Sequence, residues 1–342
     1  MRAVLNLSNF PNHRDVQHDA GALRVSLCFY VSTTKLLVIL GPTASGKTRL
    51  AVHVAHRLNG EIISADSRQV YRSMDIGTGK DLADYVVDEQ TVPYHLIDII
   101  DAGQSYNVYQ FQQDFTRATT DIQQRNRLPV VCGGTGLYLD AVLSSHAFTA
   151  IPRDDAFRAE LETRSDDELQ QLFRQNPSTY SSLADTSTRK RLIRAIEIGR
   201  YLSRHPDTPL TQAVAPPPAV VFGINIPVEL RRQRITERLQ ARLQSGMVDE
   251  VERLLQQGIP AEKLIFYGLE YKFITQYLQG ELVYTTMVAR LETAIHQFAR
   301  RQMTFFRKME RDGLTIHWLD GQKPTAELVE DVVTRFNQEK DS

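Results

Sequence analysis

Short apolar runs that end in polar or glycine-rich residues mark the first half of the chain. Runs at 36–40, 61–65 and 128–132 are separated by helical patterns, such as the one from Tyr109 to Arg125. Strands that alternate with helices in this way predict a βαβαβ unit with a parallel sheet. A fourth apolar run at 95–100 predicts one more strand.

The pattern changes in the second half. Between about 145 and 205, strand-like runs vanish and apolar residues recur at helical spacing among charged ones, which predicts a helical insertion. Prolines within 206–218 mark the linker that leaves this insertion, because proline punctuates and stiffens a chain. The apolar run at 220–226 predicts a return to the sheet, and the remainder, from 228 to about 311, reads as helical.

Composition adds limits on the class of protein. A chain of 342 residues suggests about two domains, and 42% apolar with 24% charged residues is ordinary for a soluble protein. Two cysteines, Cys28 and Cys132, supply neither a disulfide framework nor a CxxC metal site, which favours a reducing compartment such as the cytoplasm. No run approaches the roughly 18 apolar residues of a membrane span. The net charge of −1 neither suggests nor excludes a nucleic-acid partner.

The most specific local signal lies directly behind the first apolar run. Residues 41–48 read Gly-Pro-Thr-Ala-Ser-Gly-Lys-Thr, the G-x-x-x-x-G-K-[ST] pattern typical of ATP-binding and other nucleotide-binding proteins, and a helical pattern follows. In such a loop the glycines let backbone amides surround an anion, Lys47 adds a positive charge, and the Thr48 hydroxyl can ligate Mg²⁺. The motif therefore predicts binding of a diphosphate or polyphosphate group.

Together these features predict an α/β protein with a P-loop NTPase-like parallel sheet, flanking helices and an inserted all-helical domain. The expected organisation is a poorly ordered extension at 1–33, an α/β core at 34–144 and 219–320, a helical insertion at 145–205, a proline-rich linker at 206–218 and a C-terminal tail at 321–342.

Polar residues follow two further predicted strands. Asp66 comes directly after the second, and Gly133-Gly134-Thr135-Gly136 follows the third. In open parallel sheets ligands bind outside the carboxyl ends of the strands, so these residues are expected to converge on the phosphate loop. Asp66 could hold Mg²⁺ through water, act as a general base, or cap the next helix. The glycine-rich segment could approach a ligand or be only a turn.

Cationic residues gather in three helical stretches. One lies at 189–204 within the insertion, a second at 290–311 with interleaved phenylalanines, and a third at 231–238, where Arg234 and Arg238 share a helix face. Such residues are usually solvated, but basic helices around a phosphate site are also compatible with a nucleic-acid track.

Several motifs in order resemble the tRNA dimethylallyltransferase (tRNA isopentenyltransferase) family, in its bacterial form. The loop at 41–48 has that family's sequence, and Ile63–Tyr71, Met74–Lys80 and Val131–Tyr138 follow at the family's distances. The stretch Arg191–Glu197 is similar to a motif of the family's insertion. The resemblance runs from about 36 to 319.

This resemblance implies transfer of a dimethylallyl group from dimethylallyl diphosphate to the exocyclic amine of an adenosine beside the tRNA anticodon. Asp66 is implied to be the general base, steadied by Thr135, while Lys47 and Arg238 stabilise the departing diphosphate and Thr48 holds Mg²⁺. The diphosphate would be bound by Gly41, Pro42, Thr43, Ala44, Ser45, Gly46, Lys47 and Thr48. The tRNA, through its anticodon stem-loop, would contact Asp66, Ser67, Arg68, Gln69, Thr135, Arg158, Lys190, Arg191, Leu192, Ile193 and Arg194.

One position departs from the family pattern: Glu270 stands where glycine is common, which bears on tRNA contacts near 263–272. A monomer without a membrane partner is expected. The alternatives are a prenyltransferase of free adenine nucleotides, which would not need a basic insertion, a P-loop kinase of small molecules, and a regulatory nucleotide-binding module. The series Asp66-Ser67, Asp75–Thr78 and Gly133–Thr135 favours the tRNA enzyme over the last two.

Overall fold

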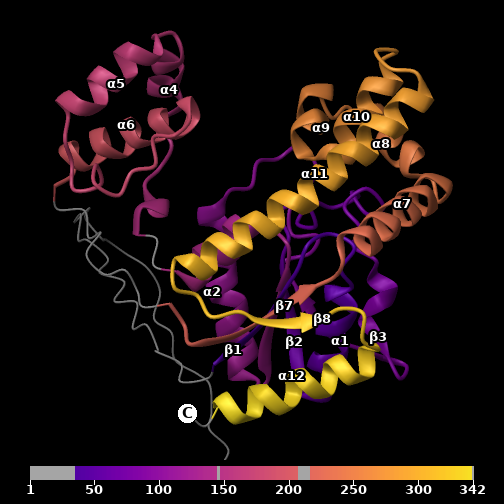
Figure 1. Cartoon of the computed structure of the whole chain (residues 1–342). Helices are drawn as coiled ribbons and strands as arrows, with labels where there is room; N and C mark the ends of the chain where they lie inside the picture. Colours follow the sequence, from indigo (N-terminus) through magenta and orange to yellow (C-terminus); the bar gives the residue numbers. More distant parts are fainter. Residues whose placement is uncertain (1–34, 145–146, 207–215, 341–342) are drawn as a thin grey trace, which may run out of the picture. The chain divides into compact units, whose positions relative to one another are not determined.

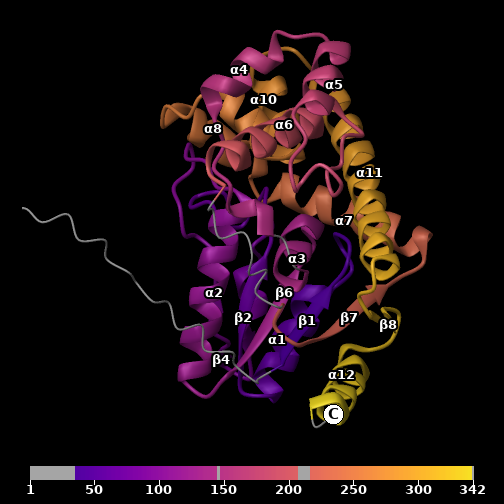
Figure 2. The ribbon, with the colours of Figure 1, turned by 90° about the vertical axis from the view of Figure 1, so that its left-hand side faces the viewer.

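A six-stranded, all-parallel sheet forms the centre of the protein in the computed structural model, which describes residues 35–144, 147–206 and 216–340 (Figure 1). The strand order is β5-β2-β6-β1-β7-β8, and Figure 2 shows the last five strands side by side in this order. The strands are β1 (Leu36–Leu40), β2 (Gly60–Ala65), β5 (Tyr94–His95), β6 (Leu128–Gly133), β7 (Ala219–Asn225) and β8 (His317–Asp320). The predicted α/β class and parallel sheet are confirmed.

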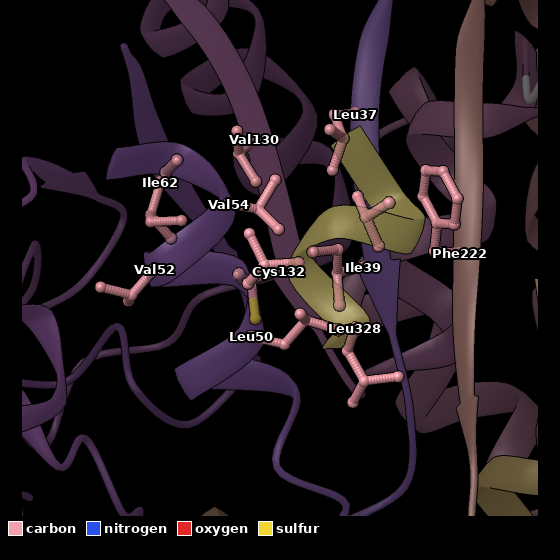
Figure 3. Packing of buried hydrophobic residues seen from close by; sticks show 14 of the residues in the cluster. Leu37, Ile39, Leu50, Val52, Val54, Ile62, Val130, Cys132, Phe222 and Leu328 are labelled. Atoms are coloured by element: carbon pink, nitrogen blue, oxygen red, sulfur yellow. The ribbon is translucent and has the colours of Figure 1, made fainter. Parts of the chain in front are cut away.

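Helices cover both faces of this sheet because its central strands are apolar on both sides. In β1, Leu37 and Ile39 pack into one core cluster, whereas Leu36, Val38 and Leu40 pack into the other. The first cluster lies under α1 (Lys47–Arg57) and α12 (Thr325–Lys340), and Figure 3 shows part of its packing. The second lies under α2 (Val108–Gln124), α3 (Gly136–Leu143) and part of α11 (Tyr284–Arg311).

Two predicted segments differ in the structure. The strand expected at 95–100 is only Tyr94–His95, because Leu96 and Asp98 adopt positive φ angles of 62° and 56° that end an extended strand. The segment set apart as a tail at 321–342 contains α12, whose buried face packs into the core. The predicted extension at 1–33 lies outside the described residues, as do 207–215 of the predicted linker.

The helical insertion has a small core of its own. Its helices are α4 (Asp155–Glu162), α5 (Asp166–Gln175) and α6 (Arg189–Arg204), preceded by a 3₁₀ turn at Ala147–Ala150. Asp154, Ser165 and Thr188 cap the three helices by accepting backbone N–H bonds. The core consists of Leu161, Leu169, Leu192, Ile193 and Ile196.

The helical region after β7 packs against an early loop. Its helices are α7 (Val228–Gln244), α8 (Met247–Gln256), α9 (Ala261–Tyr267), α10 (Leu269–Leu278) and the start of α11. They enclose a third apolar cluster that includes Val70, Tyr71 and Met74 from the loop after β2. Between that loop and α2 lie a 3₁₀ turn at Leu82–Tyr85 and a hairpin of β3 (Val86–Val87) and β4 (Gln90–Thr91). Among the described helices, none is long and apolar enough to cross a membrane.

A buried carboxylate ties α2 to the edge of the sheet. Glu61 on β2 is 3% exposed and accepts two hydrogen bonds from Arg125, at 3.0 and 2.6 Å, and one interaction from His95 at 2.7 Å. Burial by itself would raise the pKa of Glu61, but the hydrogen bonds from Arg125 and His95 together hold that pKa below its ordinary value. The charged form therefore stabilises the fold.

Replacing this carboxylate tests its contribution. We expect Glu61→Gln to lower the free energy of unfolding by about 2–4 kcal/mol at neutral pH, because two guanidinium bonds lose their charged partner. A lowered folded-state pKa gives stability that is present above the unfolded value of about 4.3 and is lost as pH falls through the folded value. The difference from wild type in urea titrations should therefore shrink as pH is lowered from 7 to 3. Glu330→Gln, at an exposed ion pair, is the control; a pH-independent difference would contradict the assignment.

Candidate active site

A cavity of about 900 Å³ opens at the carboxyl ends of β1, β2 and β6. Its walls include the phosphate loop (residues 43–48 of 41–48), Asp66, and the turn at 132–136. Segments from α7, α9, α10, α11 and the start of α12 also line the cavity. The structure therefore brings the phosphate loop, Asp66 and Thr135 to one site, as the strand order requires.

The phosphate loop has the geometry of an anion cradle. Ala44 and Gly46 adopt positive φ angles of 60° and 86°, and α1 begins at Lys47. The first amides of α1, which have no helical carbonyl partner, therefore lie at the wall of the cavity. Burial lowers the pKa of Lys47, an effect opposed by the charge of Asp66. The buried hydroxyl of Ser45 has no hydrogen-bond partner within the described structure.

Asp66 and Thr135 lie on adjacent turns. The Asp66 carboxylate accepts a hydrogen bond from the Arg68 amide at 2.9 Å, and residues 67–70 form turns, so Asp66 closes a turn and caps no helix. The Thr135 hydroxyl accepts from the Ser67 amide at 3.1 Å, so Thr135 fixes the residue next to Asp66. Asp66 is half-buried and borders the cavity. The Asp66 carboxylate is therefore held by the Arg68 amide and remains accessible from the cavity.

A single buried carboxylate holds the loop at 74–80. Glu250 on α8 accepts hydrogen bonds from the amides of Asp75, Ile76 and Gly77 at 2.9, 2.7 and 3.0 Å. The Tyr271 hydroxyl donates to the same carboxylate at 2.6 Å. Gly77 must lack a side chain, since a Cβ there would lie 2.7 Å from the Tyr271 ring. The motif at 75–78 is therefore built around Glu250, and Gly77–Gly79 form part of the cavity wall.

Three arginines form a ladder along one face of α7. Arg234, Arg238 and Arg242 recur every four residues and all line the cavity. Arg238 and Arg242 share one carboxylate, Asp81, at 2.7 and 3.3 Å. Arg238 also reaches the Thr43 hydroxyl of the phosphate loop at 3.4 Å. Two guanidinium groups on one carboxylate leave an excess of positive charge that suits an anionic ligand.

The ladder depends on a glycine. A Cβ at Gly79 would lie 1.6 Å from Arg242 Nη2 and 2.5 Å from Arg238 Nη2, and the φ of +66° also favours glycine. Burial, and then the neighbouring Arg238, lowers the pKa of Arg242. Its charge is therefore only partly compensated by the protein.

Two further ionisable groups border the cavity. Burial raises the pKa of Glu270, although Arg242 and Arg238 oppose the shift. Burial likewise raises the pKa of the Cys132 thiol to about 11, so the thiol stays protonated near neutral pH. Cys132 is therefore not suited to act as a nucleophile here.

The residues implied to contact tRNA divide into two groups. Ser67, Arg68 and Gln69 all border the cavity, but the side chain of Gln69 is buried and bonds to Ser64 at 2.8 Å and to the Gly79 carbonyl at 3.1 Å. Gln69 therefore joins the end of β2 to the loop at 74–80 and has little surface for RNA.

In the insertion, burial restricts which residues of α6 can contact RNA. The side chains of Leu192 and Ile193 are 3% exposed and lie in the core, so they pack internally. Arg158 and Arg194 both face the buried Glu197, and Arg194 also donates to the Ile151 carbonyl at 2.6 Å. Among the predicted residues of this helix, Lys190 and Arg191 are the exposed ones.

Two residues that line the cavity, Arg242 and Gln302, are not among those predicted from the sequence. Arg242 could have been found from the four-residue spacing that joins Arg234 to Arg238. Gln302, which bridges two cavity loops, lies in α11 with no local signal.

The chain matches the family model described as IPP transferase over residues 69–309 and the model described as Isopentenyl transferase over residues 34–95. It is 54% identical over 287 residues to tRNA dimethylallyltransferase 1 of Geotalea uraniireducens, covering 84% of this chain and 92% of that protein. It is 49% identical over 304 residues to tRNA dimethylallyltransferase 2 of Bacteroides fragilis, covering 89% and 98%.

Two solved structures are also similar to this chain. The full-length tRNA isopentenylpyrophosphate transferase of Bacillus halodurans superposes with a TM-score of 0.65 at 31% identity, covering 90% of this chain and 97% of that one. A eukaryotic dimethylallyltransferase structure shares the fold, with a TM-score of 0.69 at 23% identity over 84% of this chain and 74% of that one.

The role of Glu250 is testable by a single substitution. Glu250→Gln replaces one acceptor oxygen by an NH₂ group that faces backbone donors, so we expect a loss of about 2–4 kcal/mol in the free energy of unfolding. Urea titration followed by circular dichroism measures the loss. Glu252→Gln, exposed on the same helix, should change little; equal unfolding midpoints in the two variants would show that Glu250 does not hold the loop.

Proposed function

We propose, from the premise that the chain belongs to the IPP transferase family of tRNA dimethylallyltransferases, that it transfers a dimethylallyl group from dimethylallyl diphosphate to tRNA. The acceptor is the exocyclic amine of an adenosine next to the anticodon, and the enzyme acts as a cytoplasmic monomer. The observation that carries the proposal is that one cavity joins a diphosphate cradle, an arginine ladder and a carboxylate.

The donor side of the cavity is suited to a departing diphosphate. Amides of the phosphate loop, Lys47 and the Arg238 guanidinium surround the place where negative charge grows as the carbon–oxygen bond breaks. Fixed cations and dipoles at such a place lower the barrier because they need no reorganisation during the reaction. Arg242 adds a second guanidinium one helical turn along.

The residues also fit a bound Mg²⁺. Thr48 and Asp66 place a hydroxyl and a carboxylate, both hard oxygen donors, on the same cavity. Mg²⁺ commonly takes few protein ligands and completes its shell with phosphate oxygens and water. Thr48 would hold the ion, which when bound adds positive charge to the diphosphate.

The acceptor side provides a base. As the amine nitrogen of adenosine bonds to the allylic carbon and the diphosphate departs, the nitrogen loses one proton, which the Asp66 carboxylate accepts. Thr135 supports this role by fixing Ser67 beside it. The adenosine must leave its stack to bring its amine to a carboxylate inside the cavity.

Exposed cations supply surfaces for the tRNA backbone. On α11 the exposed side chains include Arg300, Arg301, Arg307 and Arg311, and Arg301 borders the cavity. Lys190 and Arg191 add exposed charge on α6. Contacts of this kind position a nucleic acid without reading its bases.

The reaction is tested with labelled dimethylallyl diphosphate and Mg²⁺, offered with unmodified tRNA or with AMP. We expect label in tRNA alone. Label in AMP alone would instead support a prenyltransferase of free nucleotides, and label in neither would contradict prenyl transfer.

Asp66→Asn tests the base. We expect its rate of transfer to fall by about 10²–10⁴-fold, because general-base catalysis supplies that range, while binding of inorganic diphosphate stays within about threefold of wild type. Asp88→Asn, an exposed aspartate outside the cavity, is the control. Near-normal turnover of Asp66→Asn would remove Asp66 from the mechanism.

The second guanidinium is tested by Arg242→Met. We expect inorganic diphosphate to bind about tenfold more weakly, because a charge-assisted contact is lost from a desolvated site. Isothermal titration calorimetry measures this, with Arg253→Met, exposed on α8, as the control. Unchanged affinity would place Arg242 outside the diphosphate site.

A further inference from the structure

One glutamine side chain connects the two loops on which the proposed reaction depends. Gln302 of α11 is 7% exposed. Its Oε1 accepts a hydrogen bond from the Thr43 amide of the phosphate loop at 2.9 Å. Its Nε2 donates to the Gly134 carbonyl, in the turn after β6, at 2.8 Å. Both ends of the amide are thus used, each by a different loop.

The geometry leaves little freedom at this bridge. A Cβ at Gly134 would lie 2.5 Å from Gln302 Nε2 and 3.1 Å from the Gly41 carbonyl oxygen, so a larger residue there would displace the Gln302 amide. A carboxamide carries an acceptor and a donor at a fixed separation. Gln302 therefore sets the spacing between Thr43 and Gly134.

The same helix contacts the turn a second time. The Phe305 ring packs on Gly136, where a Cβ would lie 2.4 Å from the ring. Gln302 and Phe305 are three residues apart and so lie on one face of α11. Helix α11 thus supports both sides of Thr135, which in turn fixes Ser67 beside Asp66.

The two connected loops have different roles in the proposed reaction. The phosphate loop holds the donor diphosphate, whereas the turn at 133–136 supports the acceptor side through Thr135. A displacement of about 1 Å between reacting groups can cost about 10²-fold in rate. A rigid link between these loops therefore acts on the rate of the chemical step more than on either binding step.

We propose that Gln302 is a positioning residue that holds the phosphate loop and the Gly134–Thr135 turn at the separation needed for prenyl transfer. This inference rests on the proposed function. Gln302 acts through the Thr43 amide and the Gly134 carbonyl, and it moves no proton.

The test uses the full chain with three substitutions. Gln302→Met keeps the length of the side chain and removes both hydrogen bonds. Gln302→Glu keeps an acceptor for Thr43, but it donates to Gly134 only when its carboxyl is protonated. Gln297→Met, an exposed glutamine on the same helix, is the matched control.

Single-turnover transfer at saturating tRNA and dimethylallyl diphosphate gives the kinetic result. We expect Gln302→Met to lose about 10–100-fold in rate, while the dissociation constants of inorganic diphosphate and tRNA stay within about threefold. The rate of Gln302→Glu relative to wild type should rise as pH is lowered, because protonation restores the donor. A rate for Gln302→Met within twofold of the control, or a loss explained wholly by weaker diphosphate binding, would overturn the proposal.

Hydrogen exchange gives a result that does not depend on activity. We expect faster amide exchange in peptides that cover 41–48 and 133–136 in Gln302→Met, and unchanged exchange in Gln297→Met. Absence of transfer by the wild type would refute the proposed function, whereas equal exchange in the two variants would refute the link itself.

Discussion

The pairing of three neighbouring parallel strands is the constraint on which the rest of the site depends. Gly133 at the end of β6 is in register with Leu40 of β1 on one side and with Ala65 of β2 on the other. Adjacent strands lie about 4.8 Å apart, so the loops that follow them begin side by side. Gly133 permits this approach, since a Cβ there would lie 2.3 Å from the Ala65 carbonyl oxygen. Backbone pairing thus juxtaposes the phosphate loop and Asp66 before side chains contribute.

Charge in the cavity is balanced for a ligand that is itself negative. Lys47, Arg238 and Arg242 line the cavity, and Asp81 forms ion pairs with the two arginines. Burial lowers the pKa of Lys47 and of Arg242, which is the effect expected of cations that have lost water without gaining full protein compensation. A diphosphate would supply the missing negative charge. Burying these cations lowers stability when no ligand is bound, so we attribute their burial to ligand binding.

Helices from the second half of the chain hold loops from the first half. Glu250 gathers three amides of the loop at 74–80, and Gln302 joins the phosphate loop to the turn after β6. Loops that bind substrates have few packing contacts of their own, so supporting side chains from rigid elements define their positions. The helical region after β7 therefore belongs to the site as much as the sheet does.

Local patterns in the sequence determined the strands of the sheet core, the phosphate loop and the helical insertion, because each depends on neighbours within a few residues. Tertiary structure alone decided which side chains meet. Gln302 bonds to residues 259 and 168 positions away, and a contact at such a separation leaves no periodic trace. It also decided that Leu192 and Ile193 are buried inside the insertion and that the strand expected at 95–100 ends at His95. The sequence specifies the chemical group of each residue. The distances between these groups follow from packing and backbone pairing between distant parts of the chain.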